Sequence, residues 1–369
     1  MSIFFELKLE FSEIRENCFP GFTFRKELIV KQSFRRILFL LIPCLLFLPA
    51  KAESLLPASP LQTLMAELHS DQEKLDDALP KVIDHIHTPG EYADFSFSGE
   101  DDLLEIWFPS VRDQDAAIFL YQGQVWMLDC GDERAESETV PLLKYLGIDH
   151  IDRLINTHPH HDHLNGLYSI DAAIPIRELL ICFPEDSTIH MAAALEYCKG
   201  NGISVSYFED ESILSMGDGL VSFLSWMKVR ETENLNDRSA QFMITYGQCR
   251  YLTMADMELR GQNQLLAALG PDPLKADILR YPHHGKKQMA IDLYRAISPS
   301  LVIITNAPRI LELADSTRFL GYQHASVAYT NQNLYILHLT TDGNHWLCEE
   351  IEFDPAPYLV SAQEETEQK

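Results

Sequence analysis

The most informative stretch of the chain reads LINTHPHHDH, residues 154–163. It ends an apolar strand pattern with three imidazoles and a carboxylate in the spacing H-x-H-x-D-H, formed by His158, His160, Asp162 and His163. Imidazole nitrogen is the usual protein ligand of zinc, and carboxylate oxygen suits a harder ion such as manganese. A loop that leaves a strand can direct the first two histidines at one ion and the Asp-His pair at another. This HxHxDH motif therefore predicts a metal site.

A solvated polar turn, or a His run of the kind used as a purification tag, is the alternative interpretation of the motif. Neither explains the Asp162 carboxylate among the histidines or the apolar strand pattern that precedes them. We therefore favour metal binding, with the spacing as the argument.

Two later positions carry similar side chains at strand ends. Asp256 follows the run YLTMA and precedes a helical pattern, so it lies where α/β proteins form their sites. A helix N-cap is the ordinary structural role of such an Asp, and the two roles are compatible. His283 and His284 also end a strand pattern, before Gly285, and only one of them can readily point inward. The sequence leaves open which one does.

Outward from these motifs, residues 95–355 alternate short apolar runs with Gly-containing turns. We expect helices at 140–146, 190–199, 258–268 and 290–297. Strands are expected at 103–108, 116–121, 124–128, 153–156, 178–182, 204–208, 221–226, 241–246, 250–254, 278–281, 301–304, 333–339 and 345–351. Hairpins mixed with βα units predict an α/β sandwich of two mixed sheets flanked by helices.

The HxHxDH motif resembles the signature of the metallo-β-lactamase fold, and further motifs follow in the expected order. Residues 103–131, LLEIWFPSVRDQDAAIFLYQGQVWMLDCG, look like the opening hairpin of the ComEC-like hydrolase domain of competence proteins, with RDQDA in place of GQGDA. YLTMAD at 251–256 and KADILRYPHHG at 275–285 match that family's metal-bridging Asp and its KADxLxxPHHG element. The resemblance covers about residues 100–353.

The resemblance implies two divalent metal ions, zinc or manganese, that share Asp256. Their ligands would come from His158, His160, Asp162, His163, Asp256, His283 and His284. Asp162 and His284 are the candidate catalytic residues: Asp162 as a proton acceptor, and one of the paired histidines in contact with substrate. Asp129, at a strand end before Gly131, could orient a ligand His, although a turn-forming Asp is an equal alternative.

One difference from the β-lactamases narrows the choice of subgroup within this fold. True β-lactamases and glyoxalases carry another ligand His between the first motif and the bridging Asp, whereas His190 is the only His in that interval here, and we expect it at the surface. ComEC-like domains and the similar choline-phosphate esterases of cell surfaces also lack it, and the esterases share the ISPSLV pattern of residues 297–302. NDRS at 236–239 corresponds to an NDNS turn, which places Asn236 and Ser239 at the rim of the site.

These resemblances imply hydrolysis of a phosphodiester or phosphomonoester by a metal-activated water. Hydrolysis of a lactone, lactam or thioester is the alternative within the same fold, and the missing His counts against it. A non-catalytic metal-binding module in DNA uptake or envelope assembly is the alternative outside enzymes, and the complete ligand set counts against it. Three cations are candidates for phosphate contact or plain surface charges: Arg238, Lys286 and Lys287.

The N-terminal segment is typical of an export signal. ILFLLIPCLLFLPA at 37–50 follows Arg35 and Arg36 and precedes a small-x-small pattern at 50–52. The apolar run is short for a membrane span, which needs about 20 residues. We therefore expect residues 1–52 to be a signal peptide or an uncut signal anchor through residues 37–50, and the body to be secreted or at the cell surface. A buried core helix is the third interpretation.

The remaining chain has a linker and helical segment at 53–94, including a helical pattern at 61–79, and a polar tail at 356–369. Its 46% hydrophobic and 23% charged residues are typical of a globular protein and exclude a disordered one. The net charge is −26, and residues after 52 hold 21 Lys and Arg against 50 Asp and Glu, or −29. Tight nucleic-acid binding needs clustered cations, so we do not expect it. We expect the tryptophans and cysteines in the core rather than in a binding platform or disulfide framework.

Overall fold

The computed structural model describes residues 86–87, 97, 102–310, 325–332 and 335–359. The chain divides into two units, residues 1–70 and 71–369, and the described residues all belong to the second. The predicted leader, the helical pattern at 61–79 and the tail beyond residue 359 lie outside the described residues. Across the described residues, no helix combines the length and the apolar character that a bilayer crossing requires.

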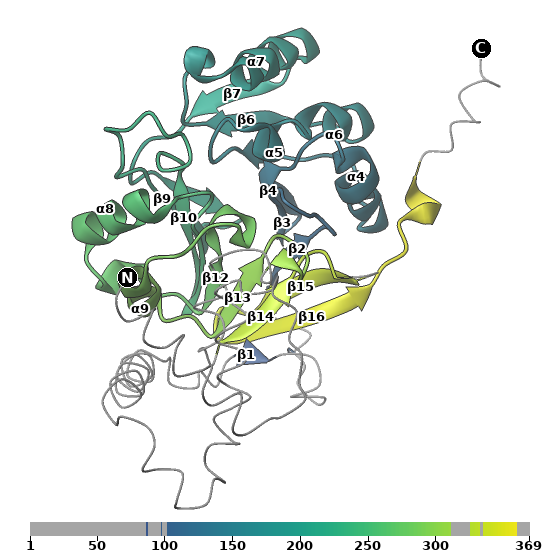
Figure 1. Ribbon diagram of the computed structural model, residues 1–369. Coiled ribbons are helices and arrows are strands. Elements are labelled where there is room, and N and C mark those ends of the chain that lie inside the picture. The colour runs from purple at the N-terminus through teal and green to yellow at the C-terminus, as the bar shows by residue number, and fades with distance from the viewer. Residues whose placement is uncertain (1–85, 88–96, 98–101, 311–324, 333–334, 360–369) are drawn as a thin grey trace, which may run out of the picture. The chain divides into compact units, whose positions relative to one another are not determined.

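Two mixed β-sheets form the centre of this unit (Figure 1). The first has the strand order β1-β16-β15-β2-β3-β4-β5-β6-β7. Its strands are β1 (Ile86–His87), β2 (Leu104–Phe108), β3 (Ala116–Tyr121), β4 (Gln124–Cys130), β5 (Arg153–Ile155), β6 (Glu178–Ile181), β7 (Ser204–Tyr207), β15 (Tyr335–Thr341) and β16 (Trp346–Glu352). Strands β2 to β4 pair antiparallel, and β4 to β7 pair parallel.

The second sheet has the order β14-β13-β12-β11-β10-β9-β8. Its strands are β8 (Ile213–Met216), β9 (Val221–Trp226), β10 (Gln241–Tyr246), β11 (Cys249–Thr253), β12 (Ile278–Arg280), β13 (Leu301–Ile304) and β14 (Ser326–Tyr329). Strands β8 to β11 pair antiparallel, and β11 to β14 pair parallel. The predicted α/β sandwich of two mixed sheets is therefore confirmed.

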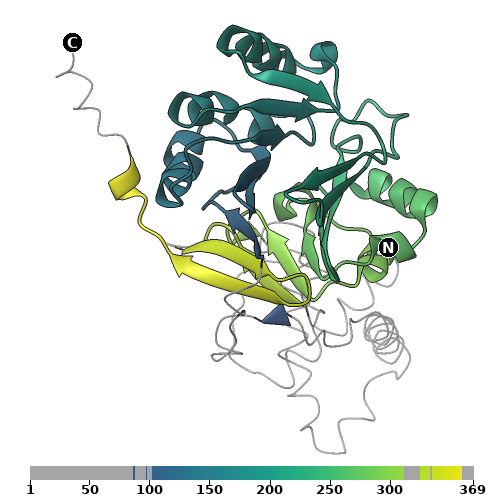
Figure 2. The same cartoon turned by 180° about the vertical axis from the view of Figure 1, so that it is seen from behind.

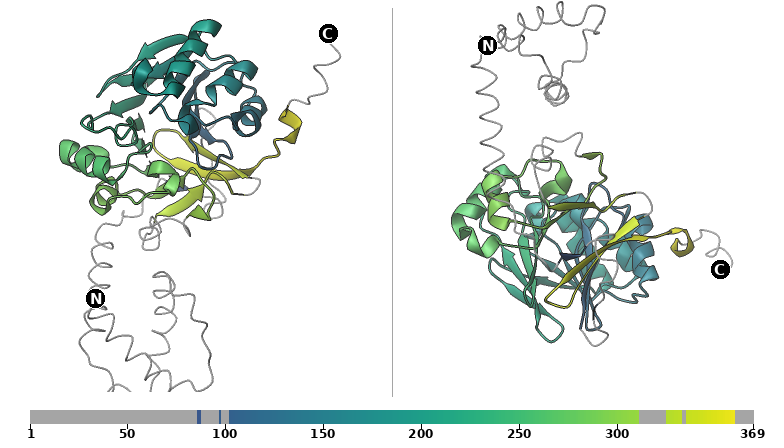
Figure 3. Two further views of the ribbon diagram at one scale, coloured as in Figure 1. Left: turned by 45° about the horizontal axis from the view of Figure 1, so that its top comes forward. Right: turned by 90° about the horizontal axis from the view of Figure 1, so that it is seen from below.

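Helices cover the outer face of each sheet (Figures 1 and 2). The first sheet carries α4 (Ala135–Tyr145), α5 (His161–Leu164), α6 (Leu167–Ala173) and α7 (Ile189–Asn201), and the second carries α8 (Leu259–Leu269) and α9 (Ile291–Ile297). Short 3₁₀ turns are η2 (Glu185–Ser187), η3 (Asp272–Leu274), η4 (Pro282–Gly285) and η5 (Ala356–Tyr358). Figure 3 shows the same layers from two further directions.

Three apolar clusters hold these layers together. One joins the facing sides of the two sheets, with Phe119 against Phe223 at a ring-centroid distance of 5.0 Å. The other two pack helices α4 to α7 on the first sheet and α8 and α9 on the second. All four tryptophans are buried in these clusters, as predicted: Trp107, Trp126, Trp226 and Trp346. Of the cysteines in the described residues, all five are free and four are buried.

Helix α7 illustrates how local sequence sets an element. Thr188 precedes it, and its hydroxyl oxygen accepts a hydrogen bond from the Met191 amide at 3.0 Å, which satisfies a donor of the first turn. Gly202 ends it in the left-handed conformation with φ 74°, which glycine adopts without a steric cost because it has no Cβ atom. Strand β1 lies in the segment that the sequence assigns to the linker, and it pairs with β16.

Candidate metal centre

The predicted ligands lie where strands of both sheets end. The HxHxDH motif follows β5, with its last two members in α5. Asp256 comes shortly after β11, and His283 and His284 follow β12 in η4. Because β11 and β12 are parallel, their carboxyl ends meet at one edge of the second sheet. The Thr157 carbonyl accepts from the Ala240 amide at 2.9 Å and ties the loop after β5 to that sheet.

Two groups of side chains at this edge could each hold a cation, and both include Asp256. The first, which we call the His158 group, consists of His158, His160 and Asp256. The second, which we call the Arg280-bordered group, consists of Asp115, His163, Asp256 and His284. The candidate ligand atoms of each group lie within 4.8 Å of one another. The sharing of one carboxylate is the arrangement that the sequence predicts for Asp256.

In the His158 group, the His158 ring lies close to both His160 and one carboxylate oxygen of Asp256. His158 Nε2 lies 3.0 Å from His160 Nδ1 and 3.9 Å from Asp256 Oδ2. Both His158 and Asp256 are fully enclosed, whereas His160 is half-buried. Burial lowers the pKa of His158 and of His160, so both imidazoles are neutral and can offer a lone pair.

The Arg280-bordered group is entirely buried. His163 Nε2 lies 3.3 Å from Asp256 Oδ1, and His284 Nε2 lies 3.5 Å from Asp256 Oδ2. Burial alone would lower the pKa of both histidines, but the nearby Asp256 carboxylate outweighs it and raises the pKa of each. Burial would likewise raise the pKa of Asp256, and the charges on His284 and His163 hold it well below its usual value. A cation held by both imidazoles would have to displace their protons.

Asp162 and His283 lie beside these groups. Asp162 Oδ2 is 3.4 Å from His284 Nε2, within reach of a cation held by that histidine. His283 Nε2 is 3.8 Å from Asp256 Oδ2, and its Nδ1 is 3.4 Å from Glu258 Oε1. Burial lowers the pKa of His283 to about 4. Of the pair that the sequence left undecided, His284 therefore belongs to a group that could hold a cation, and His283 lies beside Glu258.

Asp129 anchors the HxHxDH motif through hydrogen bonds to His163 and to the residues that precede the motif. Its Oδ2 lies 2.7 Å from His163 Nδ1 and accepts from the Thr157 hydroxyl at 2.7 Å. Its Oδ1 accepts from the Thr157 amide at 2.8 Å and from Asn156 Nδ2 at 3.1 Å. A carboxylate on Nδ1 leaves the other ring nitrogen of His163 as the atom that could face a metal. Asp129 thus contacts a histidine of the motif, and its role in orienting a metal ligand stays a prediction.

The backbone at this edge is strained. Four residues other than glycine have positive φ: Asp129 (55°), Ala255 (44°), His283 (52°) and His284 (51°). Side chains rarely adopt this region, and such strain persists where the surroundings over-determine the conformation. The turn at Ala255 places its carbonyl where the His283 amide donates to it at 2.9 Å. The strain thus brings Asp256 and the paired histidines together.

The donor set fits divalent cations. Three buried atoms that face one another have no hydrogen-bond partner among the described residues: His163 Nε2, His284 Nε2 and Asp256 Oδ1. Buried polar atoms are almost always hydrogen-bonded, so three atoms in one place that make only charge contacts with their neighbours fit a site that a cation could complete. Nitrogen and carboxylate donors are those that zinc and manganese use.

The sequence match agrees with this geometry. The family model described as the metallo-beta-lactamase superfamily matches residues 112–303, just over half of the chain's 369 residues. The chain belongs to this superfamily. Its two sheets with helices outside them are the sandwich expected of a superfamily member. No curated protein sequence matches the chain.

Several solved structures are similar to it. The metallo-beta-lactamase fold protein YhfI from Bacillus subtilis is 12% identical, with a TM-score of 0.40, over 62% of this chain and 96% of that one. Igni18, a metallo hydrolase from the hyperthermophilic archaeon Ignicoccus hospitalis, is 11% identical, with a TM-score of 0.40, over 68% of this chain and all of that one. A diphosphatase from the PhnP family is 12% identical, with a TM-score of 0.33, over 55% and 85%.

The rim residues contact this superfamily site indirectly. Asn236 Nδ2 donates to Glu258 Oε1 at 3.4 Å. The same Glu258 oxygen lies 3.4 Å from His283, so Glu258 links Asn236 to the paired histidines. Ser239 is buried, and its hydroxyl donates to the Asn236 carbonyl at 2.7 Å. Between them, Asp237 Oδ1 accepts from the Glu258 amide at 3.2 Å and from the Gly261 amide at 3.0 Å, so this turn caps helix α8.

The three candidate phosphate-binding cations all have partners near the rim. Lys286 Nζ lies 3.2 Å from Asp113 Oδ1, and Lys287 Nζ lies 3.7 Å from Glu258 Oε1. The Arg238 guanidinium lies over the Phe183 ring at 5.2 Å. His190 is half-buried, 5.9 Å from the His161 ring, and belongs to neither candidate group.

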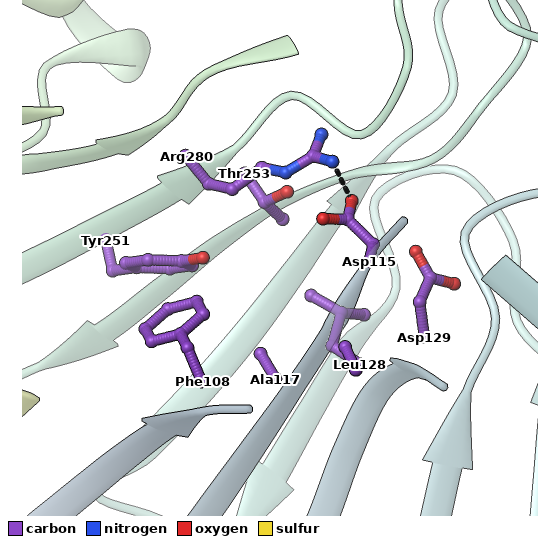
Figure 4. Close-up of a pocket in the computed structure, with 9 residues that line it drawn as sticks. Phe108, Asp115, Ala117, Leu128, Asp129, Tyr251, Thr253 and Arg280 are labelled. Atoms are coloured by element: carbon purple, nitrogen blue, oxygen red, sulfur yellow. Dashed lines mark ion pairs between the residues drawn. The ribbon is translucent and has the colours of Figure 1, made fainter. Parts of the chain in front are cut away.

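Sequence reasoning missed one pair, the ion pair of Arg280 and Asp115 (Figure 4). Figure 4 shows the two side chains pointing toward one another across the space between the sheets, above Tyr251 and Phe108. Both charged residues are buried. An Arg inside the otherwise apolar strand pattern at 278–281 is the signal that could have revealed it, because a buried cation requires a partner.

Proposed function

We propose that this protein is an exported, metal-dependent phosphoesterase of the ComEC-like subgroup, which cleaves a phosphodiester or phosphomonoester. The observation that carries the proposal is the convergence of two potential cation groups on Asp256. When bound, a pair of divalent cations lowers the pKa of a coordinated water and neutralises charge on phosphoryl oxygens. Zinc is our first choice, because four of the candidate ligands are histidines, with manganese second.

Each side chain of the site has a proposed role in the reaction. The HxHxDH motif, Asp256 and His284 would hold the ions, and Asp129 fixes the orientation of His163. Asp162 is ionised in the metal-free protein: burial opposes ionisation, but the neighbouring His163 and His284 hold its pKa far below its usual value. Its Oδ2 lies 3.4 Å from His284 Nε2, and this position beside the cation groups makes Asp162 our candidate for receiving the proton of the attacking water. His283, whose side chain is partly accessible beside Glu258, is the candidate for contact with substrate.

Three rim cations favour an anionic substrate. Lys286 and Lys287 border the paired histidines, and each keeps part of its side chain accessible. A chain this acidic repels polyanions at long range, so the local cations and the ions themselves must attract the phosphate. Export would bring cell-wall polymers, lipids or environmental DNA within reach of the site.

The test is hydrolysis of a chromogenic phosphodiester and a phosphomonoester by the full chain with added zinc or manganese. We expect turnover that Asp256→Asn abolishes, with a loss of at least about 1,000-fold. The matched control is Asp292→Asn, an exposed carboxylate on α9, which leaves the rate unchanged. Turnover of lactones or thioesters but not phosphate esters would overturn the substrate class. Metal binding without turnover of any of them would support the binding-module alternative.

A further inference from the structure

Arg280 is a fixed internal cation at the edge of the metal centre. Its Nη1 donates to the Ala255 carbonyl, and its Nη2 pairs with Asp115 Oδ2. Nη2 also lies 3.1 Å from Thr305 Oγ1. The side chain is 2% exposed, so it cannot exchange these partners for water. Burial would lower the pKa of Arg280, but Asp115 and Asp256 keep it raised, so the guanidinium stays charged.

This charge contacts three members of the Arg280-bordered group, whereas it meets the His158 group only through the shared Asp256. Nη1 lies 3.7 Å from Asp256 Oδ1, the oxygen that faces His163. Nη2 lies 3.1 Å from His284 Nδ1 and pairs with Oδ2 of Asp115, and both of these residues belong to the Arg280-bordered group. No contact between Arg280 and His158 or His160 occurs among the described residues. The His158 group meets Asp256 through the other oxygen, Oδ2.

We infer that Arg280 makes the two cation positions unequal: the His158 group binds one divalent ion tightly, and the Arg280-bordered group binds a second ion more weakly. A divalent ion in the Arg280-bordered group shares Asp115 and Asp256 with a guanidinium. At an effective dielectric constant of about 20, repulsion between a divalent ion and a guanidinium that contact the same carboxylates weakens binding by well over tenfold. The inference rests on the proposed dinuclear site, but not on which bond that site hydrolyses.

The experiment is a zinc titration of the metal-stripped full chain in competition with a chromogenic chelator. We expect two binding steps whose dissociation constants differ by at least about tenfold. Arg280→Met should strengthen the weaker step by about tenfold or more and leave the tighter step unchanged, whereas Arg280→Lys, which keeps the charge, should preserve the difference. The matched control is Arg250→Met on the neighbouring strand β11, whose guanidinium donates to the Pro273 carbonyl away from the site.

His160→Ala keeps the inference testable if Arg280→Met does not fold. His160 is half-buried, and its loss should remove the tight step and spare the weak one. Two equal steps in the unaltered protein would overturn the inference, as would a folded Arg280→Met protein with an unchanged weak step, or His160→Ala losing the weak step instead. Failure to bind zinc at all would overturn the proposed function as well. Unequal zinc binding without hydrolysis would overturn the proposed function and leave this inference intact.

Discussion

The hydroxyl of Thr305 determines how His284 can act. Thr305 Oγ1 lies 3.0 Å from His284 Nδ1, and the Arg280 guanidinium, which can only donate, lies on the same nitrogen. A neutral imidazole that binds a cation through Nε2 carries its proton on Nδ1, so that proton needs an acceptor. Among these neighbours, Thr305 supplies it, because one hydroxyl oxygen can accept from both His284 and Arg280.

We therefore expect Thr305→Val to weaken zinc binding by about 10- to 100-fold, the usual cost of losing such an orienting partner. Thr305→Ser keeps the oxygen and should bind as the unaltered protein does. Chelator competition measures the affinity, and circular dichroism checks the fold. A valine variant with undiminished affinity would show that the hydroxyl does not orient the ring.

The raised pKa values of His163 and His284 predict how zinc affinity depends on pH. In the metal-free protein both imidazoles hold protons above the ordinary His value of about 6.5. Zinc binds only the deprotonated form, so affinity should fall as pH decreases, and the fall should begin above the ordinary pKa of His, about 6.5. Isothermal titration in buffers of different ionisation enthalpy measures the protons released on binding. A constant affinity down to about pH 6 would contradict this expectation.

At the scale of elements, helix α6 packs unusually close to strand β4. A Cβ atom added at Gly166, the residue before α6, would collide with the Cys130 carbonyl and lie 2.9 Å from the Ala135 Cβ. We expect Gly166→Ala to destabilise the protein by about 2 to 3 kcal/mol, because the helix must move away from the strand. Urea denaturation measures the change.

Gly200, inside helix α7, is the matched control for that substitution. Nothing lies within 4 Å of a Cβ atom added there. Gly200→Ala should therefore stabilise the protein, by about 0.5 to 1 kcal/mol, through helix propensity. Equal effects of the two substitutions would argue against close packing as the reason for Gly166.

Helix α4 carries a carboxyl group that opposes folding at high pH. Burial raises the pKa of Glu138 to about 7, against 4.5 for an unperturbed Glu, although Gln114 donates to it. The folded state thus holds this proton more tightly than the unfolded state, so its contribution to stability is present below about pH 4.5 and is lost as pH rises to about 7. After allowance for partial exposure, Glu138→Gln should be more stable than the unaltered protein by about 1 kcal/mol above pH 7. Denaturation at two pH values checks this; a difference independent of pH would contradict it.

The individual strands and helices also show which elements can be predicted from sequence patterns. Central strands whose side chains are mostly buried, such as β9 and β10, were predictable to the residue. Strand β8 was missed because it lies at the sheet edge with mostly accessible side chains, and β14 lies at the opposite edge. Helices α5 and α6 were missed because they are short, and a run of HDHL has no apolar face that would identify it as helical.

The site was predictable in its ligand types but not in its neighbours. A spacing such as HxHxDH constrains chemistry within a few residues of chain. Arg280 and Asp115 come from different sheets, and their pairing depends on the packing of β3 against β12, which no local pattern encodes. The choice between His283 and His284 likewise depends on backbone angles of about 50° that the sequence does not reveal.

At the scale of the whole molecule, bound metal should contribute to stability. The chain has a net charge of −26, and carboxylates concentrate at the metal centre. A ligand that binds only the folded state at 100 times its dissociation constant stabilises it by about 2.7 kcal/mol. We therefore expect a chelator to lower the unfolding temperature by several degrees and added zinc to restore it. An unfolding temperature insensitive to both would mean that these residues hold no structural ion.

The capping of α8 by Asp237 has a further consequence for this protein. The turn at residues 236–239 borders the site, yet its central carboxylate is fastened to the first turn of a helix, and a Cβ at Gly261 would strike that carboxylate. Swinging the turn outward would break both hydrogen bonds of Asp237 and uncap the helix. We therefore expect this side of the site to keep its shape when substrate binds, so that adaptation to different substrates falls to other parts of the rim.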